Sequence, residues 1–456
     1  MKRTVALFRR HLECLKAHEP GRIATIALAT LAAGSTVLYF RVEQLQDDLD
    51  MHMPEFIGLL LLAGILYVIA VFLVERFRLG RAAMMVILAG TVLFRLVLLP
   101  GTPALSDDVY RYQWDGRVQR AHLNPYVANP SSPELASLLN PDNPEPPGID
   151  TPTIYPPLSE FVYRMIETVP GYKRVSTILD LGCVGVLMLL LAAMNIRLHR
   201  VLTYAWNPAV LLSFAMSGHF DPLAILMLLA ALFFLVRNRP KLSVATLALA
   251  VLSKLFPVLL LPAFLKRVRV AYAGIFALLV FAFYVPFSGA GLHLFDGAKN
   301  YGRDWSNNAS FFPLLQFVTR SKASAEFFEG LMVLAAIGYL AKKGAGLLWS
   351  SLVLTGGVLL VSPTVYPWYF TWSIPFLCFC PSPAWLLMSV TSVLGYTPPI
   401  ADGAGGPFTN SLLMVSLEYG PVYLWLAYYC WAARKRRSTA ARENFCFPVR
   451  EGWIDQ

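Results

Sequence analysis

The sequence has 456 residues, of which 56% are hydrophobic and only 14% are charged. So little polar surface cannot cover a soluble protein of this length, which excludes a soluble globular fold and predicts an all-α polytopic membrane protein. The net charge of +10 is the excess expected of basic cytoplasmic loops, and it makes nucleic acid a poor candidate as a partner.

The first hundred residues predict a basic N-terminal segment followed by three membrane helices. Residues 1–22 are basic and show no small-residue cleavage site after the first apolar run, so we expect a retained helix rather than a signal peptide. Apolar segments at residues 23–40, 56–74 and 84–99 are separated by an acidic loop and then by a basic one. By the positive-inside rule, the N-terminus is cytoplasmic and the third helix ends at the outer face.

A long outer loop is predicted at residues 101–173. Prolines recur through residues 125–157 and prevent a regular element over most of that stretch. Residues 158–169 have apolar side chains at the spacing of a helix with one apolar face. We expect this helix to lie along the membrane surface.

Three further spans are predicted at residues 176–194, 201–216 and 222–236, with short basic loops between them on the cytoplasmic side. This topology places the turn SGHFD, which contains His219 and Asp221, on the outer face. Residues 242–269 have basic residues at both ends and Lys254 and Pro257 at their centre. We expect a broken or re-entrant pair that presents Lys254 inside the protein; the alternative is one kinked span whose lysine reaches the headgroups.

The rest of the chain predicts spans at residues 271–287, 327–340 and 347–361, two more crossings, and a last span at 412–433. An outer loop containing Arg303 follows the first of these, and the motif SPTVYPWYF, with Tyr366 and Trp368, follows the third. The prediction is one transmembrane domain at residues 23–433 with 12–14 helices. The tail at residues 434–456 is basic at its start and is expected in the cytoplasm, like the N-terminus.

Charged and aromatic residues concentrate directly after the third apolar segment, in LSDDVYRYQWDGRVQRAHLNPY at residues 105–126. On a helix, Asp108 and Arg111 lie on one face, and Tyr112 and Asp115 continue that face. A carboxylate beside a guanidinium stays ionised and can accept a proton or hold a cation. The alternative is an interfacial helix with a surface salt bridge.

The predicted topology brings the polar clusters around Asp108, His219, Arg303 and Tyr366 to the outer side, which indicates one site there. Transfer reactions outside the cytoplasmic membrane use donors carried on lipids, and a lipid phosphate needs cationic partners. The available cations are Arg111, Arg117, His219, Lys254 and Arg303. A carboxylate base, Asp108, then completes an inverting glycosyl transfer. Aromatic residues such as Tyr155, Tyr366 and Trp368 suit sugar faces or an interfacial belt.

Five motifs in this order carry a resemblance: SDDVYRYQWDGRVQRAHLNPY, TIYPPLSEFVY, WNPAVLLSFAMSGHFDPLA, SKLFPVLLLP and SPTVYPWYFTWSIP. Together they resemble the GT-C superfamily of integral-membrane glycosyltransferases, and most of all its bacterial mannosyltransferase-like branch, which uses polyprenyl-phosphate sugars. The resemblance implies a multi-helix fold with a catalytic acid in an early outer loop. It assigns Asp108 as the base, with Asp107 as its less certain neighbour.

The same resemblance places His219 and Asp221 near the sugar, and Lys254 and Tyr366 near the lipid phosphate and sugar. It leaves open which sugar is transferred, mannose or another hexose, and which envelope lipid or glycan accepts it. Two other functions remain as alternatives: a transporter or flippase for lipid-linked saccharides, and a non-catalytic lipid-binding scaffold of envelope assembly. No cofactor is expected, and no metal, because the side chains of adjacent acids diverge; Asp221 and His219 are the residues that could still complete a metal site.

Overall fold

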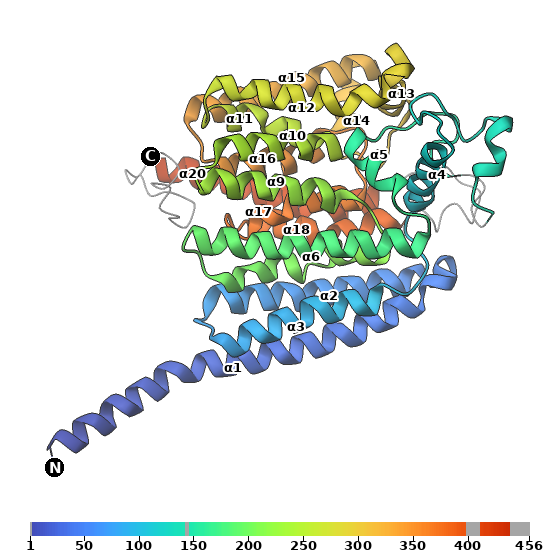
Figure 1. Cartoon of the computed structure of the whole chain (residues 1–456). Coiled ribbons are helices and arrows are strands. Elements are labelled where there is room, and N and C mark those ends of the chain that lie inside the picture. The colour runs from blue at the N-terminus through green and yellow to red at the C-terminus, as the bar shows by residue number, and fades with distance from the viewer. Residues whose placement is uncertain (1, 142–145, 398–410, 438–456) are drawn as a thin grey trace.

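The computed structural model describes residues 2–141, 146–397 and 411–437. Its described residues form helices and loops and contain no strand, which confirms the predicted all-α class. Figure 1 shows a bundle of roughly aligned helices with a smaller helical region, containing α4 and α5, at one end. We call this end of the bundle the site end.

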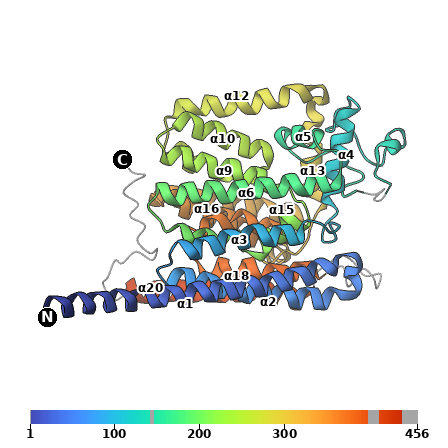
Figure 2. The same cartoon turned by 60° about the horizontal axis from the view of Figure 1, so that its bottom comes forward.

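The first three helices form a layer at one side of the bundle (Figures 1 and 2). They are α1 (Lys2–Gln44), α2 (Leu49–Arg76) and α3 (Arg81–Leu98), with the short 3-10 helix η1 (Gln46–Asp48) in the first turn. The predicted N-terminal segment and first span therefore form one continuous helix. Because α3 runs toward the site end, the chain enters the predicted outer loop there.

The next layers contain α6 (Val169–Ala193), α9 (Asp221–Val236), α10 (Pro240–Ser253) and α12 (Ala273–Tyr284). The helix α9 packs between α6 and α10, and α10 packs against α12. Among the described residues, six helices are long and apolar enough to cross a membrane, and five apolar helices are shorter. The sequence predicted 12–14 membrane helices, so fewer helices of spanning length are found than predicted, and other apolar stretches form short or broken helices.

The predicted span at residues 201–216 is not one helix. This stretch consists of four short pieces: η3 (Leu198–Val201), α7 (Leu202–Ala205), α8 (Pro208–Leu211) and the π-helix η4 (Leu212–Met216). The break occurs at Asn207, whose side chain accepts a hydrogen bond from the Ala209 amide, and at Pro208, which cannot continue a helix. Residues 201–225 are all buried, so this segment runs through the centre of the protein.

The predicted break at Lys254 is confirmed. The helix α10 ends at Ser253, and the chain returns through η5 (Phe256–Leu260) and α11 (Leu261–Leu265). Lys266 then donates to the carbonyl of Ala341, at the end of α15 opposite the site end. The helix α10 and the returning segment of η5 and α11 thus form a re-entrant pair, and the turn between them lies at the site end.

The C-terminal part of the bundle is made of α15 (Lys322–Lys343), α16 (Leu347–Val361) and the short elements that follow them. These are η8 (Pro367–Trp372), α17 (Ile374–Leu377), α18 (Pro383–Thr391) and η9 (Ser392–Tyr396). The last helix, α20 (Leu412–Arg437), packs on α18 and η9. Of the predicted tail at residues 434–456, residues 438–456 lie outside the described part of the chain.

The site end is built from α4 (Asp108–Arg120), η2 (Pro133–Leu138), α5 (Pro157–Arg164), α13 (Asp296–Asp304) and α14 (Phe312–Thr319). The 3-10 helices η6 (Val270–Tyr272) and η7 (Val285–Phe295) flank α12. The predicted interfacial helix is shorter than expected, and its apolar face is not the buried one. Ser159, Glu160 and Tyr163 face the protein, because Glu160 has polar partners there.

Candidate active site

The start of α4 holds the two adjacent carboxylates. Asp107 is the N-cap residue and Asp108 the first residue of the helix, and the backbone amide of Asp108 donates to Ser106 Oγ at 3.3 Å. The partial positive charge at a helix N-terminus favours a negative side chain in this position. The sequence thus places both acids where α4 itself stabilises their ionised forms.

His219 reaches the same place from the central segment. The π-helix η4 is followed by Gly218, whose φ of +75° an L side chain rarely adopts, and a Cβ there would lie 3.0 Å from Lys173 Cγ. The amide of His219 donates to the Ser213 carbonyl at 2.9 Å, and Ser176 Oγ donates to the His219 carbonyl at 2.5 Å. The SGHFD turn is therefore rigidly held, and the His219 side chain is fully buried.

Asp108, His219 and Tyr112 form a closed triangle of polar contacts. His219 Nδ1 lies 3.3 Å from Asp108 Oδ2, and the Tyr112 hydroxyl lies 3.4 Å from Asp108 Oδ2 and 3.5 Å from His219 Nδ1. Because an ionised carboxylate only accepts hydrogen bonds, the hydrogen lies on Nδ1 and both groups donate to Asp108. Burial favours a raised pKa, but the hydrogen bond and charge of His219, with Lys254 and Tyr112, outweigh it and lower the pKa of Asp108.

The predicted pairing of Arg111 with Asp108 is wrong. Arg111 Nε contacts Asp115 Oδ1 at 3.1 Å, one turn further along α4. Arg111 pairs with Asp115 within α4, whereas the Asp108 side chain turns toward His219 on another segment. The ionised state of Asp108 therefore depends on His219 and not on Arg111.

Asp107 has a different environment from its neighbour. Asp107 lines a cavity beside α4, described below as cavity 1, and its side chain does not cap the helix. Loss of hydration beside the cavity wall is the larger cause, and the negative charge of Asp108 the smaller one, of the rise in the pKa of Asp107 to about 6. The pair thus contains one anchored carboxylate of lowered pKa and one cavity-facing carboxyl that titrates near neutrality.

Three stacked rings extend from the triangle into the cavity. The His219 ring lies 4.0 Å from the Trp368 ring at an interplanar angle of 22°, and Trp368 lies 4.5 Å from Tyr366 at 8°. Tyr366 and Trp368 line the cavity, as does Tyr155. A flat aromatic wall beside a carboxylate is the arrangement that suits the apolar face of a sugar ring.

Lys254 forms an ion pair within the protein. Its Nζ lies 2.6 Å from Oδ1 of Asp221, which is fully buried at the N-terminus of α9 and also accepts a hydrogen bond from Trp372 Nε1 at 2.6 Å. The ammonium lies 5.3 Å from the Tyr369 ring centre and 5.6 Å from that of Trp372. Lys254 therefore has an anionic partner within the protein, because the central segment brings Asp221 to it.

Two cavities meet at Lys254. Cavity 1 has a volume of about 270 Å³ and is lined by Asp107, Asp108 and a set of aromatic residues: Tyr155, Tyr301, Trp305, Tyr366, Trp368, Tyr369 and Tyr396. Cavity 2 has a volume of about 420 Å³ and lies between the α10–α11 turn, α13, α15 and α16. Lys254, Tyr155, Tyr301 and Tyr369 line both cavities. Two volumes with one shared cation suit a reaction between two substrates.

Comparison with known families identifies the chain. A family model described as alpha-(1->6)-mannopyranosyltransferase, N-terminal domain, matches residues 21–269, more than half of the sequence. The chain belongs to this mannosyltransferase family. The resemblance to GT-C mannosyltransferases is thereby confirmed, and the protein is a glycosyltransferase of the membrane. No curated protein matches the chain.

The remaining predicted residues of this mannosyltransferase lie outside the triangle. Arg111 lines cavity 1, but its guanidinium is buried and bonded to Asp115 and to loop carbonyls. Asp115 is fully buried. Arg117 donates to the Leu138 carbonyl, and Arg303 pairs with Asp304 on the surface with 71% of its side chain exposed; neither lines cavity 1 or cavity 2.

Sequence reasoning missed several residues of the site. Tyr369 and Tyr301 share a hydrogen bond of 2.6 Å between their hydroxyls and line both cavities, and Tyr396 lines cavity 1. The tyrosine density of the YPWYF motif is a signal for Tyr369. A buried acid that lies beside the site and lines neither cavity, Glu160, was also missed, although a carboxyl among apolar residues of a short helix is such a signal. Among the residues that the structure describes, no three His, Cys, Asp or Glu side chains converge as metal ligands would.

Removing the Lys254 charge is expected to destabilise the protein. In Lys254→Met the buried Asp221 carboxylate keeps only the Trp372 hydrogen bond, and breaking such a pair from one side typically costs about 3 kcal/mol. Thermal unfolding of the purified protein in detergent measures this loss. The double variant Lys254→Met with Asp221→Asn removes both charges and should recover most of the lost stability. A single variant as stable as the wild type would contradict the pairing.

Proposed function

We propose that this mannosyltransferase takes mannose from a polyprenyl-phosphate donor and transfers it to a hydroxyl group of an envelope lipid or glycan, with inversion at the anomeric carbon. Asp108 accepts the proton of the acceptor hydroxyl, and the acceptor oxygen bonds to the anomeric carbon. The bond from that carbon to the phosphate oxygen breaks, and polyprenyl phosphate leaves. The observation that carries this proposal is the meeting of two cavities at Lys254, within a family of mannosyltransferases.

Cavity 2 supports the binding of a lipid donor. Its walls include Leu255, Phe256 and Trp372, together with Glu326 and Glu329 of α15. The other face of α15 exposes large apolar side chains such as Phe327 and Leu334, as expected of a helix in contact with lipid tails. A prenyl chain in cavity 2 would place its phosphate beside Lys254, whose ammonium has three donors and uses one on Asp221.

Cavity 1 supports the binding of the acceptor. Both carboxylates and the Tyr366–Trp368 stack line it, and a sugar against that stack would have a hydroxyl within reach of Asp108. His219 and Tyr112 hold one oxygen of Asp108, and within the described part of the chain no hydrogen bond to the other oxygen competes with the acceptor. A base fixed in this way needs no reorganisation during the reaction.

The distribution of charge supports a site on the outer face of the cytoplasmic membrane. Basic residues gather at the end of the bundle opposite the site end, where Arg197 and Arg200 pair with Glu75 and where Lys266 meets the end of α15. Both described chain ends also lie there. By the positive-inside rule, that end faces the cytoplasm and the carboxylates face outward.

Replacing Asp108 is expected to remove transfer but not donor binding. Asp108→Asn should lower turnover about 10²-fold or more, because loss of a general base has this effect, while Asp107→Asn should cost less than about tenfold. Transfer of labelled mannose measures turnover, and donor-induced thermal stabilisation measures binding. If Asp107→Asn is the inactive variant, the two acids exchange roles. If both variants transfer mannose normally, the mechanism is wrong. If the wild type moves the donor across the membrane and transfers no mannose, the result would favour the alternative function of a flippase for lipid-linked saccharides.

The pH profile distinguishes the two acids independently. Asp107, with a pKa of about 6, is protonated below that pH, whereas Asp108, with a lowered pKa, stays ionised. If Asp108 is the base, kcat should change by no more than about twofold between about pH 8 and pH 5. An acid limb centred near pH 6, with the rate falling toward zero as pH decreases, would contradict Asp108 as the base and point to Asp107 or Asp115, because burial raises the pKa of both to about 6.

Transfer is expected to proceed without a divalent metal. The charge that develops on the phosphate lies beside Lys254, and the adjacent acids diverge from the first turn of α4. Treatment with a chelator, followed by removal of the chelator, should leave the rate of transfer within about twofold of the untreated enzyme. Loss of activity that magnesium or manganese restores would overturn this expectation.

A further inference from the structure

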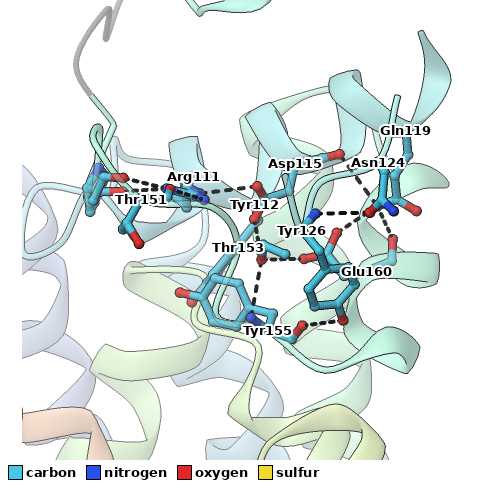
Figure 3. Close-up of polar contacts among 12 residues, drawn as sticks. Arg111, Tyr112, Asp115, Gln119, Asn124, Tyr126, Thr151, Thr153, Tyr155 and Glu160 are labelled. Atoms are coloured by element: carbon cyan, nitrogen blue, oxygen red, sulfur yellow. Dashed lines mark hydrogen bonds and ion pairs between the residues drawn. The ribbon is translucent and has the colours of Figure 1, made fainter. Parts of the chain in front are cut away.

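A network of buried polar side chains lies beside cavity 1 and plays no part in the mechanism above (Figure 3). Arg111, Asp115 and Gln119 come from successive turns of α4, Thr153 from the outer loop and Glu160 from α5. All five side chains are buried. The network therefore joins α4 and the outer loop, which line cavity 1, to α5 behind them.

Arg111 holds one turn of the outer loop. Its Nη1 donates to the carbonyls of Pro147, at 3.2 Å, and Gly148, at 2.8 Å, and its Nη2 donates to the carbonyl of Thr151 at 3.0 Å. These three residues line cavity 1. A planar guanidinium can satisfy several carbonyls and a carboxylate at once, which the single ammonium of a lysine cannot.

The Thr153 hydroxyl lies between two carboxyl groups. Its Oγ1 is 3.0 Å from Asp115 Oδ2 and 2.7 Å from Glu160 Oε1, and it also accepts a hydrogen bond from the Tyr155 amide. A hydroxyl has one hydrogen to donate, and two ionised carboxylates offer none. One of the two acids must therefore carry a proton to complete this arrangement.

The partners of each acid decide where that proton resides. Asp115 Oδ1 accepts from the Arg111 guanidinium, so the negative charge belongs on Asp115. Glu160 Oε2 accepts from the neutral amide of Gln119 at 2.7 Å. Burial, with the nearby Asp115 charge, raises the pKa of Glu160 well above its usual value.

Thus Glu160 donates its proton to Thr153, and Thr153 donates to Asp115. We propose that Glu160 is held as the neutral acid and that its proton, through Thr153, fixes the position of the Asp115 carboxylate. Asp115 in turn holds Arg111, which is therefore a positioning residue for residues 147–151 in the wall of cavity 1. The proposal rests on the proposed function only in that cavity 1 binds a substrate. Asp108 is anchored separately by His219, so loss of the network should loosen the wall without removing the base.

The structure provides a matched pair of variants. In Glu160→Gln the amide oxygen can accept from Gln119 and the amide nitrogen can donate to Thr153, which reproduces both hydrogen bonds of the neutral acid. Glu160→Ala removes both contacts. Thr153→Val, which keeps the shape but removes the hydroxyl, replaces Glu160→Ala if that variant does not fold.

Hydrogen exchange of the unliganded protein tests the proposal without any assay of activity. The amides of Thr151 and Thr153 are bonded to Gly148 and Pro125, and they report on the order of this wall. Exchange over residues 146–153 should be unchanged in Glu160→Gln and faster by about tenfold or more in Glu160→Ala, Thr153→Val and Arg111→Lys. Infrared difference spectra should contain a protonated carboxylic acid band in the wild type that Glu160→Gln lacks.

Kinetics then separate positioning from a purely structural role. Arg111→Lys should raise KM for one substrate about tenfold and change kcat by less than about threefold, and Glu160→Gln should match the wild type in both. If Glu160→Gln loosens the wall as much as Glu160→Ala, or if the acid band is absent, the neutral acid is excluded. Unchanged exchange in Glu160→Ala excludes the positioning role. If no mannosyl transfer is found at all, the proposed function fails while the exchange and infrared results still decide this inference.

Discussion

The site depends on the contact between Asp108 and His219. A carboxylate inside a largely apolar protein is costly unless a donor meets it, and here that donor is a buried imidazole from a segment 111 residues away along the chain. For the two to meet, the chain must pass through the centre of the bundle in short pieces and reverse at Gly218. The buried run at residues 201–225 is thus what brings a donor to Asp108, the carboxylate that we propose as the base.

The same constraint explains the second charged pair. Asp221 lies two residues beyond His219 and begins α9, so the turn that positions the imidazole also positions the carboxylate that Lys254 needs. Lys254 reaches it only because α10 stops at Ser253 and the chain turns back at the site end. Lys254, at the junction of the two cavities, and Asp221 therefore neutralise each other within the protein.

The outer loop shows how a segment rich in proline is ordered. Its carbonyls cannot form a regular ladder, and Arg111 supplies donors to three of them from a helix that is itself anchored at the site. The charge of Arg111 is matched by Asp115, and the second acid, Glu160, is accommodated through Thr153. Order in this wall thus comes from buried polar contacts rather than from regular secondary structure.

The sequence alone was sufficient for properties that depend on local composition and spacing. Short stretches of sequence were enough to predict the membrane class, the apolar helices such as the one at residues 347–361, the break at Lys254 and the acidic motif at Asp108. Each of these depends on local hydrophobicity or on a proline, which affect only neighbouring residues. The order of motifs also identified the kind of glycosyltransferase, and the family match confirms this.

Only the tertiary structure decided which charges pair. From spacing on α4, Arg111 was assigned to Asp108, yet Arg111 binds Asp115 and Asp108 binds His219. Helical spacing allows both pairings, and the choice between them depends on a distant segment that no local pattern describes. For the same reason the partners of Lys254 and Glu160 were not predictable, because each of these polar groups meets a partner that comes from elsewhere in the chain.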